Sequence, residues 1–528
     1  MTLALSSSSV TGWQRLAQIT ALLAPLVAPA ASPRPSSQPV PITLEECIRT
    51  ALTQNREIQI ERVQPRLAQL ALAGAAAAYD PVLFSDTRWE NLADSGGFDP
   101  ADFSRDAIYQ ADTEVSRMGL TGLGPLGLSY SLSTDYAHSV GLRNGFDFDS
   151  YSLRLAATVR QPLLKNLWID QARYTLRSNS SRLRSARWLL EHRVMAVLHR
   201  TADAYQELVH AQELVRTQER LRATRETLLA HVQRLVDGGK LSRTDATLAA
   251  AESAASATRV AEARHLATLA DHALKTLLGH TWTLPTPAPV QPVPQPFVPG
   301  SLPDLSECRL TALSRRPDLA HLRQETKRAH LDVRYWRNQL FPALDLVGSY
   351  GRRGSSTAQV VPPFLTDASF AQAWEEVTDG NAPNHGIGFI LSLPLSRKRE
   401  RSQYRASQEL RALAELRTQQ HEELILHEIA DAHAALSSTT ERIELTRQAR
   451  GLAEDALAAE ERRLGSGTST IFVVLQLQAA LAAAQLQESR TRTDHLQALN
   501  RLEFARGTIL DAHQIAWSES TADEPTSP

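Results

Sequence analysis

The chain has 528 residues, enough for two or three ordinary domains or for one elongated architecture. Its 56 basic and 58 acidic residues give a formal net charge of −2, which argues against a nucleic acid as the main partner, because such binding needs a basic surface. Apolar residues make up 42% of the sequence and exclude wholesale disorder, and the two cysteines exclude a disulfide scaffold or a four-cysteine zinc site.

The first 30 residues are typical of an export signal. Arg15 precedes a short apolar run, 16–28, which ends in a small-x-small cleavage pattern. The run is too short and too rich in proline to span a bilayer, and no later segment approaches 18 consecutive apolar residues. We therefore predict a signal peptide over 1–30 and a linker over 31–42. The alternative is a disordered N-terminus that is not cleaved.

Two halves of the chain repeat the same order of elements. Leu44–Leu52 matches Leu305–Leu313 at an offset of 261 residues, and Pro162 matches Pro394 at an offset of 232. The offset falls inside the region of strand-like segments, where surface loops tolerate insertion. A proline-rich linker over 281–303 separates the halves. The pattern indicates that one supersecondary unit has been duplicated.

Each repeat is predicted to contain a helix, strands, a long helix, a glycine turn and another helix. For the first repeat, 43–280, the predicted segments are a helix at 43–78, strands at about 82–161, a helix at 165–236 and a helix ending at 278. For the second repeat, 304–510, they are a helix at 303–339, strands at about 343–394, helices at 396–464 and 468–506, and then a disordered tail at 511–528.

The long helix of the first repeat carries a heptad pattern. Its apolar positions step alternately by four and three residues through Leu190, Val194, Val197, Thr201, Ala204, Leu208, Ala211 and Val215, and Ile425, Ile429, Ala432, Leu436 and Ile443 keep the same spacing in the second repeat. A helix of about 72 residues reaches roughly 108 Å, and the two shorter helices together reach about as far. We predict two half-length helices stacked alongside each long one, in a rod or tunnel wall about 100 Å long.

The strand segments alternate as outer-membrane strands do. Tyr151–Arg160 places its apolar residues on one face and its polar residues on the other, and 82–89, 344–350 and 387–393 follow weaker versions of the pattern. Such segments with an export signal favour a membrane barrel, and the alternative is a soluble sandwich with one face in water. Two strands per repeat give four per chain, which cannot close, and open edges are excluded in lipid. Several chains must therefore share one barrel.

A further hairpin at 112–136 has no counterpart in the second repeat. We predict that it decorates the external mouth, and the alternative is that it adds strands to the barrel. The predicted fold class is mainly α with a β-barrel portion, built from an internally duplicated unit and containing a long coiled-coil tunnel.

The repeated Leu-x-x-Cys-x-x-x-Ala-Leu opening, Gln161–Leu164 at a strand end, and the Arg-Leu-x-x-Gly turns between helices resemble the TolC-type outer-membrane efflux and secretion channels over roughly 42–510. The resemblance implies three chains that share a twelve-stranded barrel, with the helices continuing it as a periplasmic tunnel. It implies a passive exit duct in outer-membrane lipid. The implied partners are a periplasmic adaptor protein and an inner-membrane pump or ABC transporter, with no nucleic acid, metal or cofactor.

The same resemblance places the two glycine turns at the periplasmic tip, where the adaptor docks and the pore closes. The implied docking residues are Arg234, Gly238, Gly239, Leu241, Ser242, Arg463, Gly465, Gly467 and Thr470. Well-known members carry acidic gate residues six and nine positions after the second tip glycine, where this chain has Val473 and Gln476. We therefore predict a gate with fewer acidic groups, formed by Asp245, Ile471, Phe472, Val473 and Gln476. A plain helix-hairpin turn is the alternative for both segments.

Two other classes of function are alternatives to a channel. A soluble periplasmic coiled-coil adaptor or scaffold would share the heptads but would lack strands that face lipid. An enzyme has no support, since no catalytic constellation stands out and the histidines at 421, 427 and 433 are spaced by six, which does not place them on one helix face. Cys47 and Cys308 occupy equivalent repeat positions and are predicted to be small buried residues without a bond between them. Drugs, metals and proteins all remain open as the transported substrate.

Overall fold

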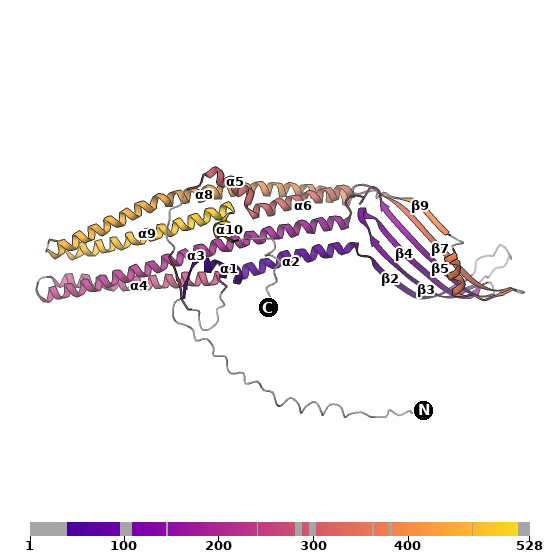
Figure 1. Cartoon of the computed structure of the whole chain (residues 1–528), viewed down its shortest axis with the longest axis horizontal. Coiled ribbons are helices and arrows are strands. Elements are labelled where there is room, and N and C mark those ends of the chain that lie inside the picture. The colour runs from indigo at the N-terminus through magenta and orange to yellow at the C-terminus, as the bar shows by residue number, and fades with distance from the viewer. Residues whose placement is uncertain are drawn as a thin grey trace, which may run out of the picture.

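The computed structural model describes residues 40–95, 108–143, 146–239, 241–279, 288–294, 302–361, 364–379, 383–466 and 468–515. The molecule is an elongated helical rod with a sheet at one end and two helix-hairpin tips at the other (Figure 1). The predicted signal peptide and most of the linker at 31–42 lie outside the described residues.

In the part of the first repeat that the structure describes, there are four α-helices: α1 Leu44–Gln54, α2 Arg56–Ala76, α3 Gln171–Asp237 and α4 Arg243–Leu277. The prediction of one helix at 43–78 is wrong, because the chain breaks at Asn55, which has an extended backbone (φ −64°, ψ 124°). The Asn55 Oδ1 accepts the amide hydrogens of Glu57 at 2.9 Å and Ile58 at 3.3 Å, and thus caps α2.

The second repeat has the same layout, with α5 Leu305–Arg315, α6 Pro317–Gln339, α8 Lys398–Gly465 and α9 Ile471–Arg506, followed by the short α10 Ile509–Ala512. Here the single helix predicted over 303–339 divides at Arg316, because the residue before Pro317 is pushed out of the helical region. The tail predicted from 511 begins within α10. Residues 516–528 lie outside the described part of the chain.

The predicted stacking of half-length helices on long ones is present. The α3 and α8 helices have 67 and 68 residues, so each reaches about 100 Å. The α2 and α4 helices pack along α3, and α6 and α9 pack along α8, while α3 also contacts α6 and α9 and so joins the two repeats (Figure 1). Most of the predicted heptad positions on α3 are buried, with Val194, Val197 and Leu208 at 1% exposure or less.

Among the described helices, α9 alone is long and apolar enough to cross a membrane by length and composition. It packs along α8 and α3, however, and contributes Leu502 and Ala505 to the core of the second repeat. Its apolar character therefore follows from its place between two long helices.

Midway along the rod, residues 288–294 of the proline-rich linker and the start of the described chain pack beside α3. The β1 strand, Val40–Ile42, pairs in parallel with β6, Val290–Pro292. The buried Tyr205 hydroxyl lies 3.1 Å from the carbonyl oxygen of Ile42 and 2.7 Å from that of Val293, so it can bridge the two segments. The largest hydrophobic core of the molecule lies at this level.

Among the described residues, the sheet contains six long strands: β2 Val82–Ser95, β3 Ile108–Leu123, β4 Ser129–Arg143, β5 Phe146–Pro162, β7 Ala343–Val361 and β9 Pro383–Ser392. They pair in the order β2-β3-β4-β5-β7-β9, and every pair is antiparallel. The short β8, Phe364–Thr366, pairs with the far end of β7. The helix α7, Phe370–Asp379, packs on β7 and β5 at the end away from the rod. These strands form one layer, which is not the soluble sandwich of two sheets.

The count of two strands per repeat is wrong for the first repeat, which supplies four. The hairpin at 112–136 corresponds to β3 and β4, which lie between β2 and β5 in the sheet and do not decorate its mouth. The fall in repeat offset from 261 to 232 thus marks an inserted pair of strands. Leu126 and Gly127, with φ of 67° and 75°, form the turn between them.

Candidate functional site

The first predicted docking turn joins α3 to α4 at the end of the rod. Gly238 caps α3 with a φ of −79°, and its amide donates to the Arg234 carbonyl at 3.1 Å. Gly239 follows with a φ of 70°, a conformation that side chains disfavour, although a Cβ placed there would meet no atom within 4 Å. The requirement for glycine at 239 is therefore conformational and not steric.

A capping box starts the helix that leaves this turn. The Ser242 hydroxyl accepts the amide hydrogen of Thr244 at 3.1 Å, and the Ser242 amide donates to the Asp245 carboxylate at 3.1 Å. Asp245, predicted as a gate residue, thus has a local role in the first turn of α4. Leu241 is partly buried beneath the turn, and Arg234 is exposed beside it.

The second turn, between α8 and α9, is closed differently. Gly465 is the last residue of α8, and the Thr468 amide donates to the Arg463 carbonyl at 2.9 Å. Thr470 precedes α9 without a side-chain capping bond, and the Ser469 hydroxyl instead bonds the Glu460 carboxylate on α8. Gly467 lies outside the described residues.

A small hydrophobic core joins the two hairpins just behind the turns. It consists of Val232 from α3, Ala249 from α4, and Ile471 and Leu475 from α9, all no more than 5% exposed. Leu241 and Leu464 pack against it. Because both hairpins contribute side chains to this tip core, a change in the packing of one hairpin alters the packing of the other.

The predicted gate residues fall on two sides of α9. Ile471 is buried in the tip core, whereas Phe472 is 60% exposed and Gln476 is also exposed. Phe472 and Gln476 are four residues apart, so they share one helix face. Val473 is half-buried. The surface available to a gate is therefore narrower than predicted and centres on an aromatic ring and an amide.

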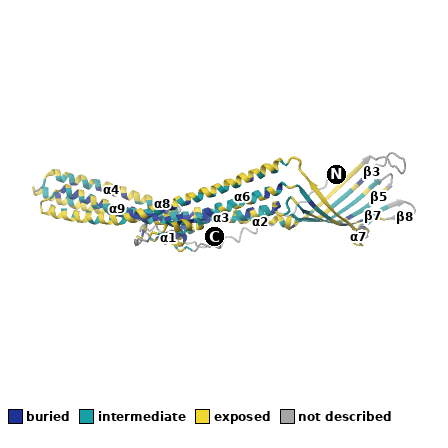
Figure 2. Ribbon diagram, turned by 90° about the horizontal axis from the view of Figure 1, so that it is seen from above, coloured by how far each residue is buried: buried dark blue, intermediate teal, exposed yellow. Residues whose placement is uncertain are grey.

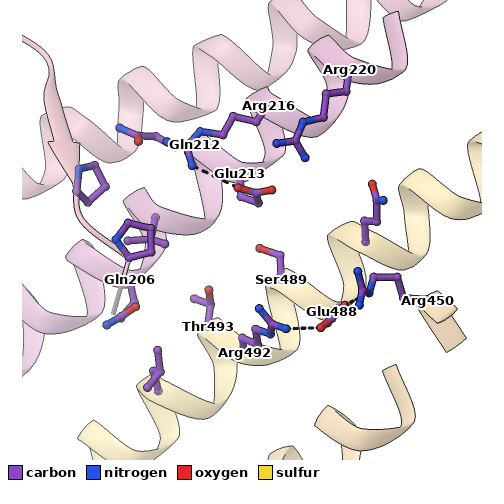
Figure 3. Close-up of a pocket in the computed structure, with 15 residues that line it drawn as sticks. Gln206, Gln212, Glu213, Arg216, Arg220, Arg450, Glu488, Ser489, Arg492 and Thr493 are labelled. Carbon is purple, nitrogen blue, oxygen red and sulfur yellow. Dashed lines mark hydrogen bonds and ion pairs between the residues drawn. The ribbon is translucent and has the colours of Figure 1, made fainter. Parts of the chain in front are cut away.

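A polar cavity of about 510 Å³ lies between the hairpins, at a level between the tip core and the paired strands β1 and β6. Arg216 and Arg220 on α3 line one wall, and the opposite wall carries Arg492 and Glu488 on α9 and Arg450 on α8 (Figure 3). The buried Glu488 carboxylate forms an ion pair with Arg450, with 2.7 Å between Oε2 and Nε. The hairpins are thus joined by apolar packing at their tips and face each other across charged groups behind them, where His210 on α3 also bonds Ser489 on α9 at 3.0 Å. No motif in the sequence indicates this cavity, because its walls are distant in the chain.

The two faces of the sheet differ in polarity. Residues directly opposite in the register share a face, and one such row is Leu83, Leu120, Leu132, Ala157 and Tyr350. On this face Ile387, Phe389 and Leu391 of β9 are 65–81% exposed. A row on the other face is Asp86, Arg117, Asp135, Arg154 and Arg353. The exposed strands are drawn yellow in Figure 2. An apolar face of this extent marks a surface that meets lipid or another protein.

His421, His433 and both cysteines have structural roles. His421 bonds Asp318 at 2.8 Å, and His433 bonds the carbonyl oxygen of Pro303 at 3.0 Å. Cys47 and Cys308 are both free and fully buried, as predicted, in two separate cores. Burial raises the pKa of the Cys47 thiol to about 12, so it is not a reactive thiolate.

Residues 310–508 match a protein-family model described as outer membrane efflux protein. Among solved structures, the outer-membrane channel OprN is 19% identical, with a TM-score of 0.62 over 88% of this chain and 90% of that one. The Campylobacter jejuni CmeC channel is 14% identical, with a TM-score of 0.61 over 88% and 86% of the two chains. The open state of the Neisseria gonorrhoeae MtrE channel is 17% identical, with a TM-score of 0.60 over 88% and 89%. No curated protein matches the sequence.

Proposed function

We propose that this chain, which belongs to the outer membrane efflux protein family, forms the trimeric exit duct of a tripartite efflux or type I secretion system. The chain is a channel protein of the outer membrane and not an enzyme. The observation that carries the proposal is the single-layer sheet with one apolar face, joined to a rod of about 100 Å. The sheet would lie in the membrane, and the rod would extend into the periplasm.

The need for neighbouring copies follows from the edges of the sheet. The β2 strand is mostly exposed and β9 is exposed at every position, and each pairs with another described strand on one side alone. Unpaired backbone groups cost several kcal/mol each in lipid, so a single chain is not a stable membrane structure. Copies arranged around an axis would pair β9 of one chain with β2 of the next. The number three comes from the family resemblance.

A soluble adaptor or scaffold, the alternative function, does not explain these strands. Leu83 and Trp89 on β2 are 72% and 76% exposed, and Ile387 on β9 is 81% exposed. A soluble protein rarely leaves a contiguous apolar surface of this kind in water. The family match also assigns the chain to the channels.

The tips are the proposed site of docking and gating. Both turns lie at the end of the rod farthest from the sheet, where a partner anchored in the inner membrane would meet them (Figure 1). The proposed docking partner is a periplasmic adaptor, which in turn couples to an inner-membrane pump or ABC transporter. Phe472 and Gln476 would form the constriction, with Val473 beside them. Docking would splay the hairpins and separate these side chains, because behind the tip core part of the interface between α3 and α9 is a polar cavity and not close packing.

The proposal is tested by purifying the protein from membranes and inserting it into a planar lipid bilayer. We expect the protein to float with outer-membrane vesicles and to give discrete conductance steps. A water-soluble monomer without conductance would refute the channel. For the gate, Phe472→Ala should raise the resting conductance, whereas Leu499→Ala, at another exposed apolar position of α9, should not. Equal conductances in the two variants would remove Phe472 from the gate. Gly467→Pro should impair export while leaving trimers intact.

A further inference from the structure

We propose that the barrel of this protein has eighteen strands, six from each of three chains, and therefore admits solutes about 10 Å wider than a twelve-stranded barrel does. The inference rests on the proposed trimer and concerns the inserted hairpin of β3 and β4. Both strands are long enough to span a membrane, with 16 and 15 residues, since about ten are needed.

In the half of the sheet nearer the rod, the apolar face runs across the inserted hairpin. Farther from the rod, the same face also carries Asp112 and Glu114 on β3, and Arg352 lies on it in β7. Leu120 on β3 lies opposite Leu83 on β2, and Leu132 on β4 lies opposite Ala157 on β5, so these four residues form one row. Met118 and Leu132 are 50% and 56% exposed on this face. A hairpin that stood in water above the membrane would have no reason to continue the lipid-facing pattern of its neighbours.

The opposite face carries a matching row of charges at the middle of the strands. Arg117 on β3 and Asp135 on β4 form an ion pair of 2.6 Å, and in the register they lie between Asp86 on β2 and Arg154 on β5. Charged groups at this depth are tolerated on the lumen face and are costly on the lipid face. The inserted strands therefore have the same inside and outside as the strands that flank them.

The edges of the six-stranded sheet allow closure with copies of the chain. The β2 strand starts at the rod and runs away from it, whereas β9 runs towards it, so a seam between β9 and a neighbouring β2 is antiparallel like every other pair. The β7 strand extends beyond Pro383, where β9 begins, and α7 covers this extension. There the Ser355 amide donates to the Glu376 carboxylate. The contact between neighbouring copies is therefore formed by β2 of one chain and β9 of the other.

The diameter of a barrel grows with its strand number. With strands about 4.8 Å apart and tilted by about 40°, eighteen strands give a diameter of about 35 Å between backbones, against about 24 Å for twelve. Six tilted strands also span about 38 Å, which is close to the width of four helix columns packed 9–10 Å apart, as each chain supplies. Four strands would span about 25 Å. With six strands per chain, the perimeter of the barrel therefore matches that of the helical tunnel where the two join.

The wider lumen indicates a substrate class of bulky solutes. The row that contains Asp86, Arg117, Asp135, Arg154 and Arg353 would line the lumen three times with mixed charge. A pore of this calibre with both signs of charge on its wall suits large polar molecules, including polypeptide segments, better than small apolar ones.

The test compares the full chain with a variant that lacks residues 108–143, in which 96–107 and 144–145 would connect β2 directly to β5. Electron microscopy of the full-length trimer, viewed along its axis, should show eighteen wall strands, and the variant should show twelve with a diameter about 10 Å smaller. A full-length trimer with twelve wall strands would overturn the inference and leave the exit duct standing. A protein that forms no membrane trimer would overturn the proposed function itself.

A second measurement does not depend on folding of the deletion. In the full chain, Thr87→Cys with Ser116→Cys should cross-link β2 to β3, since the two hydroxyls are 3.0 Å apart, and Ser139→Cys with Ser150→Cys should cross-link β4 to β5. Trimers extracted from membranes should carry both cross-links. The native chain is the control, because Cys47 and Cys308 are buried. Absence of both cross-links from intact trimers would show that the hairpin lies outside the wall.

The size of the lumen can be measured in the same proteins. Ser152→Cys on the charged face should react from outside the cell with polymer-linked maleimides, and the matched Ala157→Cys on the apolar face should not. The largest polymer that reacts at 152 should be smaller in the variant without 108–143. An unchanged size limit in a variant that forms trimers would contradict the wider pore.

Discussion

The turn between α3 and α4 offers a prediction in which one conformational effect is isolated. Gly238 and Gly239 are adjacent and exposed, but φ is −79° at the first and 70° at the second. A Cβ at either position is free of close contacts, with the nearest atom 3.4 Å from that at Gly238. Replacing each by alanine therefore changes the backbone preference and little else.

The left-handed conformation costs an alanine about 1–2 kcal/mol, so Gly239→Ala should favour the open turn by roughly 5- to 30-fold. Gly238→Ala should be neutral or slightly stabilising, by up to about 1 kcal/mol, because its φ is ordinary for alanine. Stability here means the local free energy of opening the turn, since the long helices beyond it remain packed.

Hydrogen exchange measured by mass spectrometry on the trimer reports this opening. The amides of Ser242 and Thr244 are bonded within the capping box and should exchange faster in Gly239→Ala by about the factor given above. In Gly238→Ala they should exchange at the wild-type rate or more slowly. Equal acceleration in both variants, or none in Gly239→Ala, would refute the assignment of a left-handed turn at 239.

Three further predictions concern the rod. Asp318→Asn should destabilise the protein by about 1–3 kcal/mol, because the buried Arg316 loses one of its two carboxylate partners and keeps Glu428. Denaturant unfolding measures this loss against Asp511→Asn, which affects an exposed ion pair. Despite its burial, the carboxyl of Asp318 has its pKa lowered by His421 and Arg316, so its contribution is present above about pH 4 and is lost in more acidic solution. Burial, reinforced by Arg490, lowers the pKa of His210, which bonds Ser489 at 3.0 Å, so the unfolded state takes up a proton more readily. Stability should thus fall as pH drops below about 6.5, with a shallower dependence in His210→Asn, and an unchanged slope would contradict this. Tyr205→Phe should cost about 1 kcal/mol by removing the hydroxyl that links the carbonyls of Ile42 and Val293, and an unchanged melting temperature would contradict the bridge.

Much of the rod could be predicted from the sequence, because buried residues recur at a regular spacing along its helices. The heptad positions from Leu190 to Leu208 predicted the buried seam of α3, and the matched lengths of the helices predicted how they stack. The breaks at Asn55 and Arg316 were missed, although an asparagine that can cap a helix and a residue before proline are both signals of an end. Helical periodicity continued through these breaks and outweighed them.

The presence of a sheet was predicted correctly, but its number of strands was not. The alternation in Tyr151–Arg160 identified β5, and the hairpin of β3 and β4 was recognised but placed outside the barrel, because duplication suggested equal strand numbers in both repeats. The cavity with Arg216 and Arg492 and the tip core with Val232 and Leu475 depend on contacts between helices more than 200 residues apart. Periodicity identifies which face of a helix is buried, but it does not name the partner.

The central claim is that identical copies complete the sheet, and cross-linking across the seam tests it most directly. A cysteine at Gly388 on β9, where no atom lies within 4 Å of a Cβ, would be combined with single cysteines scanned along β2 in membranes. We expect cross-linked species of two and three chains at the positions that face one another, with nothing larger. Failure of every position to link separate chains, or a ladder that continues beyond three, would contradict the closed trimer.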